Sequence, residues 1–331
     1  AKYEKYVTLA ALLIAVVFPM LSSKNYVLNV GILCLLYSLL SLSLNFVTGY
    51  TGIVVLGQAG FYGIGAYSYS ILATKLGLTF LPATILAMAI AFCFGLLIGL
   101  PTLRLKGNYL SIVTLGFCEI LRIVELNWTE LTGGPFGLKN IPSPEIFGIT
   151  FKTPRMKYYL ILVLVVLTII VIKNILASRS GPAFSAIKGD EVAAEAMGVN
   201  VFRYKLLAFA IAAAVAGLAG AFYGSYVNYI DSTNFSYNQS IQILSMTIMG
   251  GLGSIPGSII GSVFFIILPE VLRFLTSYRQ VFYGVALVLM IMFKPDGILG
   301  GFSLRQIRLF ERAQKRMEEE GPIPVERGQS E

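Results

Sequence analysis

Histidine is absent from the 331-residue sequence, cysteine occurs three times and tryptophan once. Without histidine, the chain cannot use an imidazole for acid–base catalysis or for binding a metal ion. The cysteines, Cys34, Cys93 and Cys118, lie in apolar runs and lack the close spacing of a zinc site, so we interpret them as small buried side chains. The phosphate-binding pattern GxxxxGK[ST] is also missing, which excludes ATP binding through a P-loop. No residue set suggests an enzyme.

Charged residues are scarce, and apolar residues are abundant. Only 13% of the chain is charged, against about 25% in a typical soluble domain, whereas 56% is hydrophobic. The mean hydropathy of +0.77 and the repeated apolar runs near 20 residues indicate an all-α, polytopic membrane protein. The net charge of +8 is explained by Lys and Arg in loops and in the C-terminal tail, so we expect no nucleic-acid partner.

The apolar runs predict about ten transmembrane or half-membrane helices, with Gly-rich breaks. An even count places both termini in the cytoplasm, in agreement with Lys2, Lys5 and the basic tail. We therefore expect a transmembrane domain over 1–302, with a cytoplasmic loop at 178–205, followed by a basic cytoplasmic tail over 303–331. The predicted runs are 6–21, 26–47, 51–72, 80–100, 108–125, 158–176, 206–230, two halves of 240–268, and 281–293.

The loop 178–205 is the longest charged interruption deep in the chain, and its Lys and Arg residues mark it as cytoplasmic. Gly189 breaks the chain before it, Asp190 is expected to cap a short helix with Glu191 in its first turn, and Gly198 is expected to stop it. The spacing places Ala193, Ala194 and Met197 on one small apolar face. A solvated helix without a partner fits the spacing equally well.

Several polar residues lie inside apolar runs. Glu119, Arg122 and Glu125 follow one another at three-residue spacing and can pair along one helix face, which either pins the helix or forms a polar patch on a translocation path. Gln58 lies among closely spaced glycines, where helix packing is favoured over a substrate contact. The candidate path residues are Asn45, Gln58, Glu119, Arg122 and Gln242, and the glycines near Gln58 are Gly57, Gly60 and Gly63.

A second Gly-rich stretch lies within 240–268. Gly250, Gly251, Gly253 and Gly257, together with Pro256, make a continuous helix unfavourable, so two short helices joined by an irregular turn are expected. Such backbone is tolerated inside a membrane only where protein or a water-filled cavity covers it. If 240–268 crossed the membrane once, the basic tail would lie outside, against the charge bias.

These features resemble a known family. Ala193, Ala194 and Gly198 match part of the Glu-Ala-Ala-x-x-x-Gly loop of ABC-importer permeases, although Val192 stands where the glutamate is expected. The run from Ser178 to Asn200 is more similar to branched-chain amino acid permeases of the LivM type. Further similarity covers 103–125, the turn 132–137, and the Gly250 turn with the Pro269-Glu270 pair that follows it.

The resemblance implies a non-catalytic permease subunit of an ABC importer in the cytoplasmic membrane of a prokaryote. It implies separate ATPase subunits that bind ATP, a second homologous permease, an external substrate-binding protein, and branched-chain amino acids as substrates. A urea or short-amide permease shares the pattern, and an ion-coupled secondary transporter using Glu119 is an alternative that needs no docking helix. The residues expected to contact the ATPases are Asp190, Glu191, Ala193, Ala194, Glu195, Met197 and Gly198.

Overall fold

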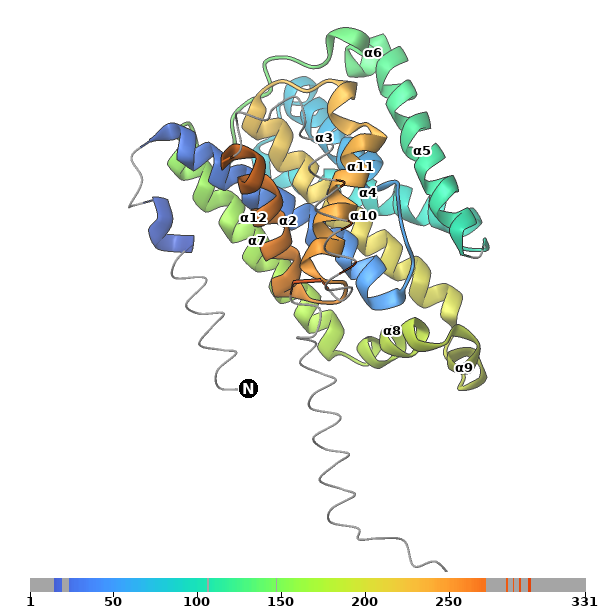
Figure 1. Ribbon diagram of the computed structural model, residues 1–331. Coiled ribbons are helices and arrows are strands. Elements are labelled where there is room, and N and C mark those ends of the chain that lie inside the picture. Colours follow the sequence, from blue (N-terminus) through green and yellow to red (C-terminus); the bar gives the residue numbers. More distant parts are fainter. Residues whose placement is uncertain are drawn as a thin grey trace, which may run out of the picture.

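The computed structural model describes residues 15–19, 24–105, 107–146, 148–271, 284, 288, 292 and 297–298. The predicted all-α class is confirmed, because helices account for nearly all regular structure in these residues (Figure 1). The exception is a small hairpin in which β1 (Glu145–Ile146) pairs antiparallel with β2 (Ile149–Thr150). The predicted runs 6–21 and 281–293 lie mostly outside the described residues, and the tail 303–331 lies wholly outside them.

Four of the described helices are long and apolar enough to cross a membrane: α2 (Asn25–Thr51), α4 (Phe80–Thr102), α7 (Pro154–Ala177) and α10 (Val201–Val227). The other predicted runs form shorter or more polar helices, so the count of about ten crossings stays a prediction. These helices are α3 (Gln58–Lys75), α5 (Asn108–Asn127), α11 (Tyr237–Gly250) and α12 (Ile255–Val271).

Helix α10 lies at the centre of the bundle, where it packs against α2, α3 and α4. Its Ala- and Gly-rich sequence leaves little side-chain bulk, so neighbouring backbones can approach it closely. A Cβ atom added at Gly65 of α3 would overlap the backbone of Gly217, and one added at Gly220 would overlap the carbonyl of Tyr62. Small residues therefore hold α3 against α10.

The predicted break in 240–268 is confirmed. Helix α11 ends at Gly250 and α12 begins at Ile255, so the two meet at the short turn 251–254. The helices then pack face to face, because a Cβ atom at either Gly250 or Gly257 would overlap the carbonyl of the other. Residues with any side chain at these two positions would force the helices apart.

The loop between α7 and α10 contains more structure than the sequence predicted. Besides the expected short helix, α9 (Glu191–Ala196), it forms a second helix, α8 (Ser180–Gly189). The sequence did not predict α8, because Gly181, Pro182 and Gly189 disfavour a helix. Proline is compatible with this position because it lies in the first turn. The ring of Phe184 on α8 is fully buried, 5.7 Å from the rings of both Phe46 and Tyr204. Packing onto α2 and α10 therefore stabilises α8.

The segments at the other end of the bundle are short. The connection from α5 to α7 contains α6 (Thr129–Thr132), the 3₁₀ helix η1 (Gly134–Phe136) and the β-hairpin, and α10 leads into the 3₁₀ helix η2 (Ser232–Phe235). Leu138 forms an isolated bridge with Ile230, which ties the two connections together. Figure 1 shows α6 at one end of the bundle, and α8 and α9 at another.

Candidate functional site

Helix α9 begins and ends where the sequence predicted. The carboxylate of Asp190 accepts hydrogen bonds from the backbone N–H groups of Val192 (2.8 Å) and Ala193 (3.1 Å), which is an N-cap. Gly198 has a φ of +83°, a left-handed conformation that glycine adopts without strain, and it follows the last turn. The expected short capped helix is therefore present between α8 and α10.

The predicted apolar face of α9 needs a correction. Ala194 is 3% exposed and turns toward the protein, whereas Met197 is 85% exposed and Ala193 is also exposed. Val192, which stands where the loop motif of ABC-importer permeases has a glutamate, is 77% exposed. The inward side of this six-residue helix thus carries Ala194, and the outward side carries two large apolar side chains, Val192 and Met197.

Polar contacts fix α9 on the protein. Glu191 forms an ion pair with Lys205 on the first turns of α10, and the side chain of Asn200 caps α10 through the backbone N–H of Arg203 (3.0 Å). Glu195 is exposed. These contacts hold α9 while leaving Val192 and Met197 free to meet another molecule.

Asn45 joins α2 to the turn between α11 and α12. The side chain is 1% exposed, and its oxygen accepts a hydrogen bond from the backbone N–H of Gly253 (2.7 Å). Its amide nitrogen donates to the carbonyl of Ser254 (3.0 Å) and to the hydroxyl of Ser258 (2.7 Å). The candidate path residue Asn45 is therefore the centre of a buried clamp, which we call the Asn45 clamp.

Helix α8 reaches the same turn from the other side. The ammonium of Lys188, in the last turn of α8, lies 3.4 Å from where a Cβ atom on Gly253 would be. A Cβ atom there would also lie 3.1 Å from the carbonyl oxygen of Gly49, near the end of α2. The turn 251–254 therefore connects α2, α8, α11 and α12, which sequence spacing alone could not reveal.

Replacing Gly253 by alanine tests how tightly this turn is packed. Gly253 has a φ of +87°, which costs a residue with a side chain about 1–2 kcal/mol. Together with the close carbonyl of Gly49, this should lower the unfolding temperature and impair transport. Leu167→Phe, on a 52%-exposed position of α7, is the control and should leave both unchanged. Equal tolerance of the two substitutions would contradict the close packing.

Gln58 also lies in a helix contact. The side chain is 1% exposed, and its amide donates to the hydroxyl of Ser43 and, at 3.5 Å, to the carbonyl of Ala212. Ser43 in turn donates to the same carbonyl (2.6 Å). The amide of Gln58 thus joins α3 to α2 and α10, which agrees with the favoured interpretation as helix packing.

Glu119 and Arg122 form the predicted pair on α5. The Nε atom of Arg122 donates to Oε2 of Glu119 at 2.7 Å, and both side chains are about one quarter exposed, at 29% and 26%. The other carboxylate oxygen accepts a hydrogen bond from the backbone N–H of Tyr237 (3.1 Å), at the start of α11. The pair therefore also joins α5 to α11, the helix that carries the partly exposed Gln242.

Glu119 and Arg122 should be energetically coupled. Partly exposed pairs at three-residue spacing contribute about 0.5 kcal/mol to the free energy of unfolding. The sum of the stability losses in Glu119→Gln and Arg122→Gln should therefore exceed the loss in the double variant by about that amount. Thermal unfolding of the four proteins in lipid measures this coupling. Strictly additive losses would show that each side chain depends on other partners.

Glu125 does not join this pair. Its side chain is buried, and its carboxylate forms neither a hydrogen bond nor an ion pair with any residue that the structure describes. A Cβ atom at Gly63 would lie 2.6 Å from Oε1 of Glu125, so the carboxylate lies directly against α3. The expected row of three paired charges is wrong, because the third side chain turns inward.

The remaining predicted glycines lie in close helix contacts. A Cβ atom at Gly57 would overlap the carbonyl of Thr114, and one at Gly60 would lie 3.0 Å from the side chain of Leu121. Both contacts are with α5. Gly57, Gly60 and Gly63 therefore line the surface of α3 on which α5 packs.

Comparison with known proteins places these features in a family. Residues 26–293 match the family model described as "Branched-chain amino acid transport system / permease component". The LivM permease of a high-affinity branched-chain amino acid transport system from Escherichia coli is 37% identical, over 89% of this chain and 75% of that protein. LivM of Salmonella typhimurium is 36% identical over the same shares of both chains.

A permease of a high-affinity branched-chain amino acid transport system with a different name, LivH, is also similar. LivH of Salmonella typhimurium is 26% identical over 80% of this chain and 91% of that protein. No solved structure matches the chain.

Proposed function

Because this chain belongs to the family of branched-chain amino acid transport permeases, we propose that it is a membrane subunit of an ATP-driven importer of leucine, isoleucine, valine or similar amino acids. It is a multi-pass protein of the cytoplasmic membrane. The permease itself is non-catalytic, and ATP is hydrolysed by separate ATPase subunits. We place α8 and α9 on the cytoplasmic side of the membrane, together with both termini, because Lys and Arg are enriched in the loop 178–205 and in the C-terminal tail.

The exposed apolar side chains of α9 carry this proposal. Val192 and Met197 stand out from a short helix that is capped by Asp190, tied to α10 through Glu191, and placed between two membrane-crossing helices. Apolar side chains that are this exposed on a rigid element favour docking into a groove of another protein. We assign that groove to the ATPase subunits.

Two further partners complete the proposed importer. The similarity to both LivM and LivH supports a pair of homologous permeases around one translocation path. An external binding protein would deliver the amino acid at the end of the bundle that holds α6 and η1. The ion-coupled alternative is less suited to the structure, because the carboxylate of Glu119 is already bound by Arg122 and by a backbone N–H group.

Uptake by the reconstituted system tests the proposal. Proteoliposomes containing both permeases, the ATPases and the binding protein should take up labelled leucine only when ATP is present, and should not take up urea. The permease purified alone should hydrolyse no ATP, since it has no P-loop. Leucine uptake that follows a proton or sodium gradient without ATP would overturn the proposal.

A further inference from the structure

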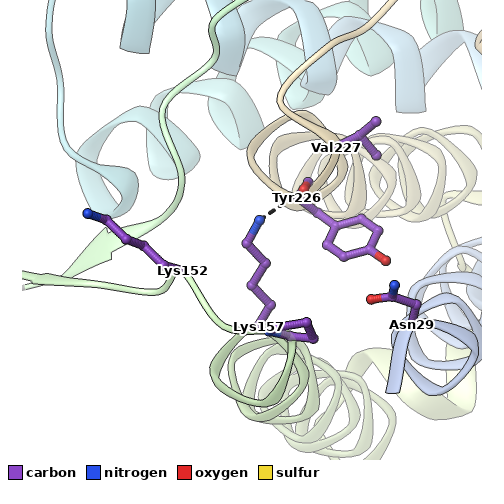
Figure 2. Close-up of a pocket in the computed structure, with 6 residues that line it drawn as sticks. Asn29, Lys152, Lys157, Tyr226 and Val227 are labelled. Atoms are coloured by element: carbon purple, nitrogen blue, oxygen red, sulfur yellow. Dashed lines mark hydrogen bonds between the residues drawn. The ribbon is translucent and has the colours of Figure 1, made fainter. Parts of the chain in front are cut away.

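A pocket with an unusual chemistry lies at the end of the bundle away from α8 and α9. It forms where α2 and α7 begin and α10 ends, and its volume is about 310 Å³. Figure 2 shows Lys157, Asn29 and Tyr226 around it, with Lys152 at one side. The lining residues are Asn29, Lys152, Pro154, Lys157, Tyr226 and Val227.

Lys157 brings a nearly buried positive charge to this pocket. The residue is 7% exposed, and its ammonium donates a hydrogen bond to the carbonyl of Tyr226 (3.0 Å), the next-to-last residue of α10. The ammonium also lies 5.5 Å from the centre of the Tyr226 ring. Neither of the ion pairs in the described part of the chain includes Lys157, so the charge is met only by partial charges. A buried charge of this kind is costly unless an opposite charge approaches it.

Other hydrogen-bond donors face the same pocket. The amide of Asn29 and the hydroxyl of Tyr226 make no hydrogen bond to any residue that the structure describes, and the ammonium of Lys157 has two further N–H groups. The exposed Lys152 adds a second positive charge at the rim, although its ammonium points away from Lys157 in Figure 2. No Asp or Glu lines the pocket. A lining that combines an ammonium group with neutral polar groups and contains no carboxylate favours an oxyanion.

The position of the pocket indicates where such an anion would come from. Lys157 lies 20 residues before the end of α7, which is roughly 30 Å along the helix, or one thickness of the membrane hydrocarbon. Val163, Leu167 and Val171 recur every four residues on α7 and are 50–54% exposed, a pattern typical of a face in contact with lipid. The pocket therefore lies near the level of lipid phosphates, at the N-terminal end of a helix that has a second, apolar face exposed along its length.

We propose that this pocket binds the phosphate of an anionic phospholipid headgroup, with the acyl chains lying along α7. The ammonium of Lys157 and the amide of Asn29 would hold the phosphate oxygens, and Lys152 would attract the headgroup from the rim. Inorganic phosphate offers the same chemistry without the acyl chains. The site is separate from the Asn45 clamp and from α9, and it adds lipid recognition to the proposed transport function.

Lipid retention by the purified permease complex tests this site. Native mass spectrometry should show phosphatidylglycerol retained by the wild-type complex in preference to phosphatidylethanolamine, and phosphatidylglycerol should raise the unfolding temperature. Lys157→Gln should lower the affinity about tenfold or more, because it removes a charge-assisted hydrogen bond to the phosphate. Lys157→Arg should restore most of it. Lys139→Gln removes a charge from an exposed loop residue and should bind lipid as the wild type does.

Three results would overturn the proposal. The first is unchanged lipid retention in Lys157→Gln. The second is equal stabilisation by inorganic phosphate, which would mean that acyl chains contribute nothing. The third is a Lys157-dependent stabilisation by leucine, which would make the pocket a substrate contact. If Lys157→Gln does not fold, the combined Asn29→Leu and Lys152→Gln variant applies the same criteria without removing the bond to Tyr226.

Discussion

The double substitution Val192→Asp and Met197→Asp should reduce ATP-driven amino acid uptake by about 100-fold or more, while the permease still folds and inserts into the membrane. Val192 and Met197 are 77% and 85% exposed, and substitutions at such positions change stability by about 0.5 kcal/mol or less. Burying a large apolar side chain in a partner contributes about 1.5–3 kcal/mol, so losing two of them should cost at least a hundredfold in affinity.

Co-purification of the ATPase subunits and uptake in proteoliposomes measure this effect. Leu76→Asp provides a matched control, because Leu76 is 67% exposed and follows the last turn of α3. That variant should retain both ATPase binding and uptake. Normal assembly and normal uptake in the Val192→Asp, Met197→Asp protein would mean that α9 is a solvated helix without a partner.

Variants of Ala194 would answer a different question. Because Ala194 is buried, Ala194→Arg should push α9 away from the bundle instead of only blocking a docking surface. Ala194→Pro removes the hydrogen bond from the backbone N–H of residue 194 to the carbonyl of Asp190 (3.0 Å), and should cost about 3 kcal/mol in the helix. Both should therefore lose structure and uptake together, and neither isolates the contact with the ATPase.

Asn45→Leu should lower the free energy of unfolding by about 3–5 kcal/mol. The substitution removes the three hydrogen bonds of the Asn45 clamp and leaves the N–H of Gly253 without a partner, whereas the carbonyl of Ser254 keeps its hydrogen bond from the backbone N–H of Ser258. The unpaired N–H costs about 1–3 kcal/mol, and each of the other two lost hydrogen bonds costs about 0.5–1.5 kcal/mol. Loss of the clamp should also free the turn between α11 and α12, so the uptake rate should fall more than protein abundance does.

Thermal and denaturant unfolding of the purified protein in lipid checks this prediction. Asn127→Leu is the control, because Asn127 is an exposed asparagine near the end of α5 whose amide donates only to the carbonyl of Ile123 in the same helix (2.7 Å). It should change stability by about 0.5 kcal/mol or less. A loss no larger in Asn45→Leu than in Asn127→Leu would show that the clamp is not a stabilising element.

Sequence patterns predicted the features that depend on local chemistry. The glycines and Pro256 gave the break between α11 and α12 because they act on the backbone itself. Asp190 and Gly198 gave the limits of α9 because capping is a contact between near neighbours in sequence. The family resemblance covered most of the chain, and the comparisons confirmed the family over residues 26–293.

Features set by tertiary contacts were not predictable in the same way. The residues that Asn45 binds lie more than 200 positions further along the chain, so no spacing indicates them. Helix α8 is stabilised by the burial of Phe184 against α2 and α10, and this tertiary contact outweighs the low helix propensity of its glycines and proline. A helix as short as α9 has too few turns for periodicity to decide that Ala194 faces inward and Met197 outward.

The stiffness of the connection through α8 has a mechanical consequence. Phe184 fixes α8 to α2, Lys188 lies on the turn 251–254, and Asp190 is the single extended residue before α9. A flexible linker without such contacts would change its own conformation when α9 moves, and the movement would not reach the helices. With these contacts in place, we expect a displacement of α9 to be transmitted through Asp190 and α8 to α2 and to the turn 251–254 at the same time.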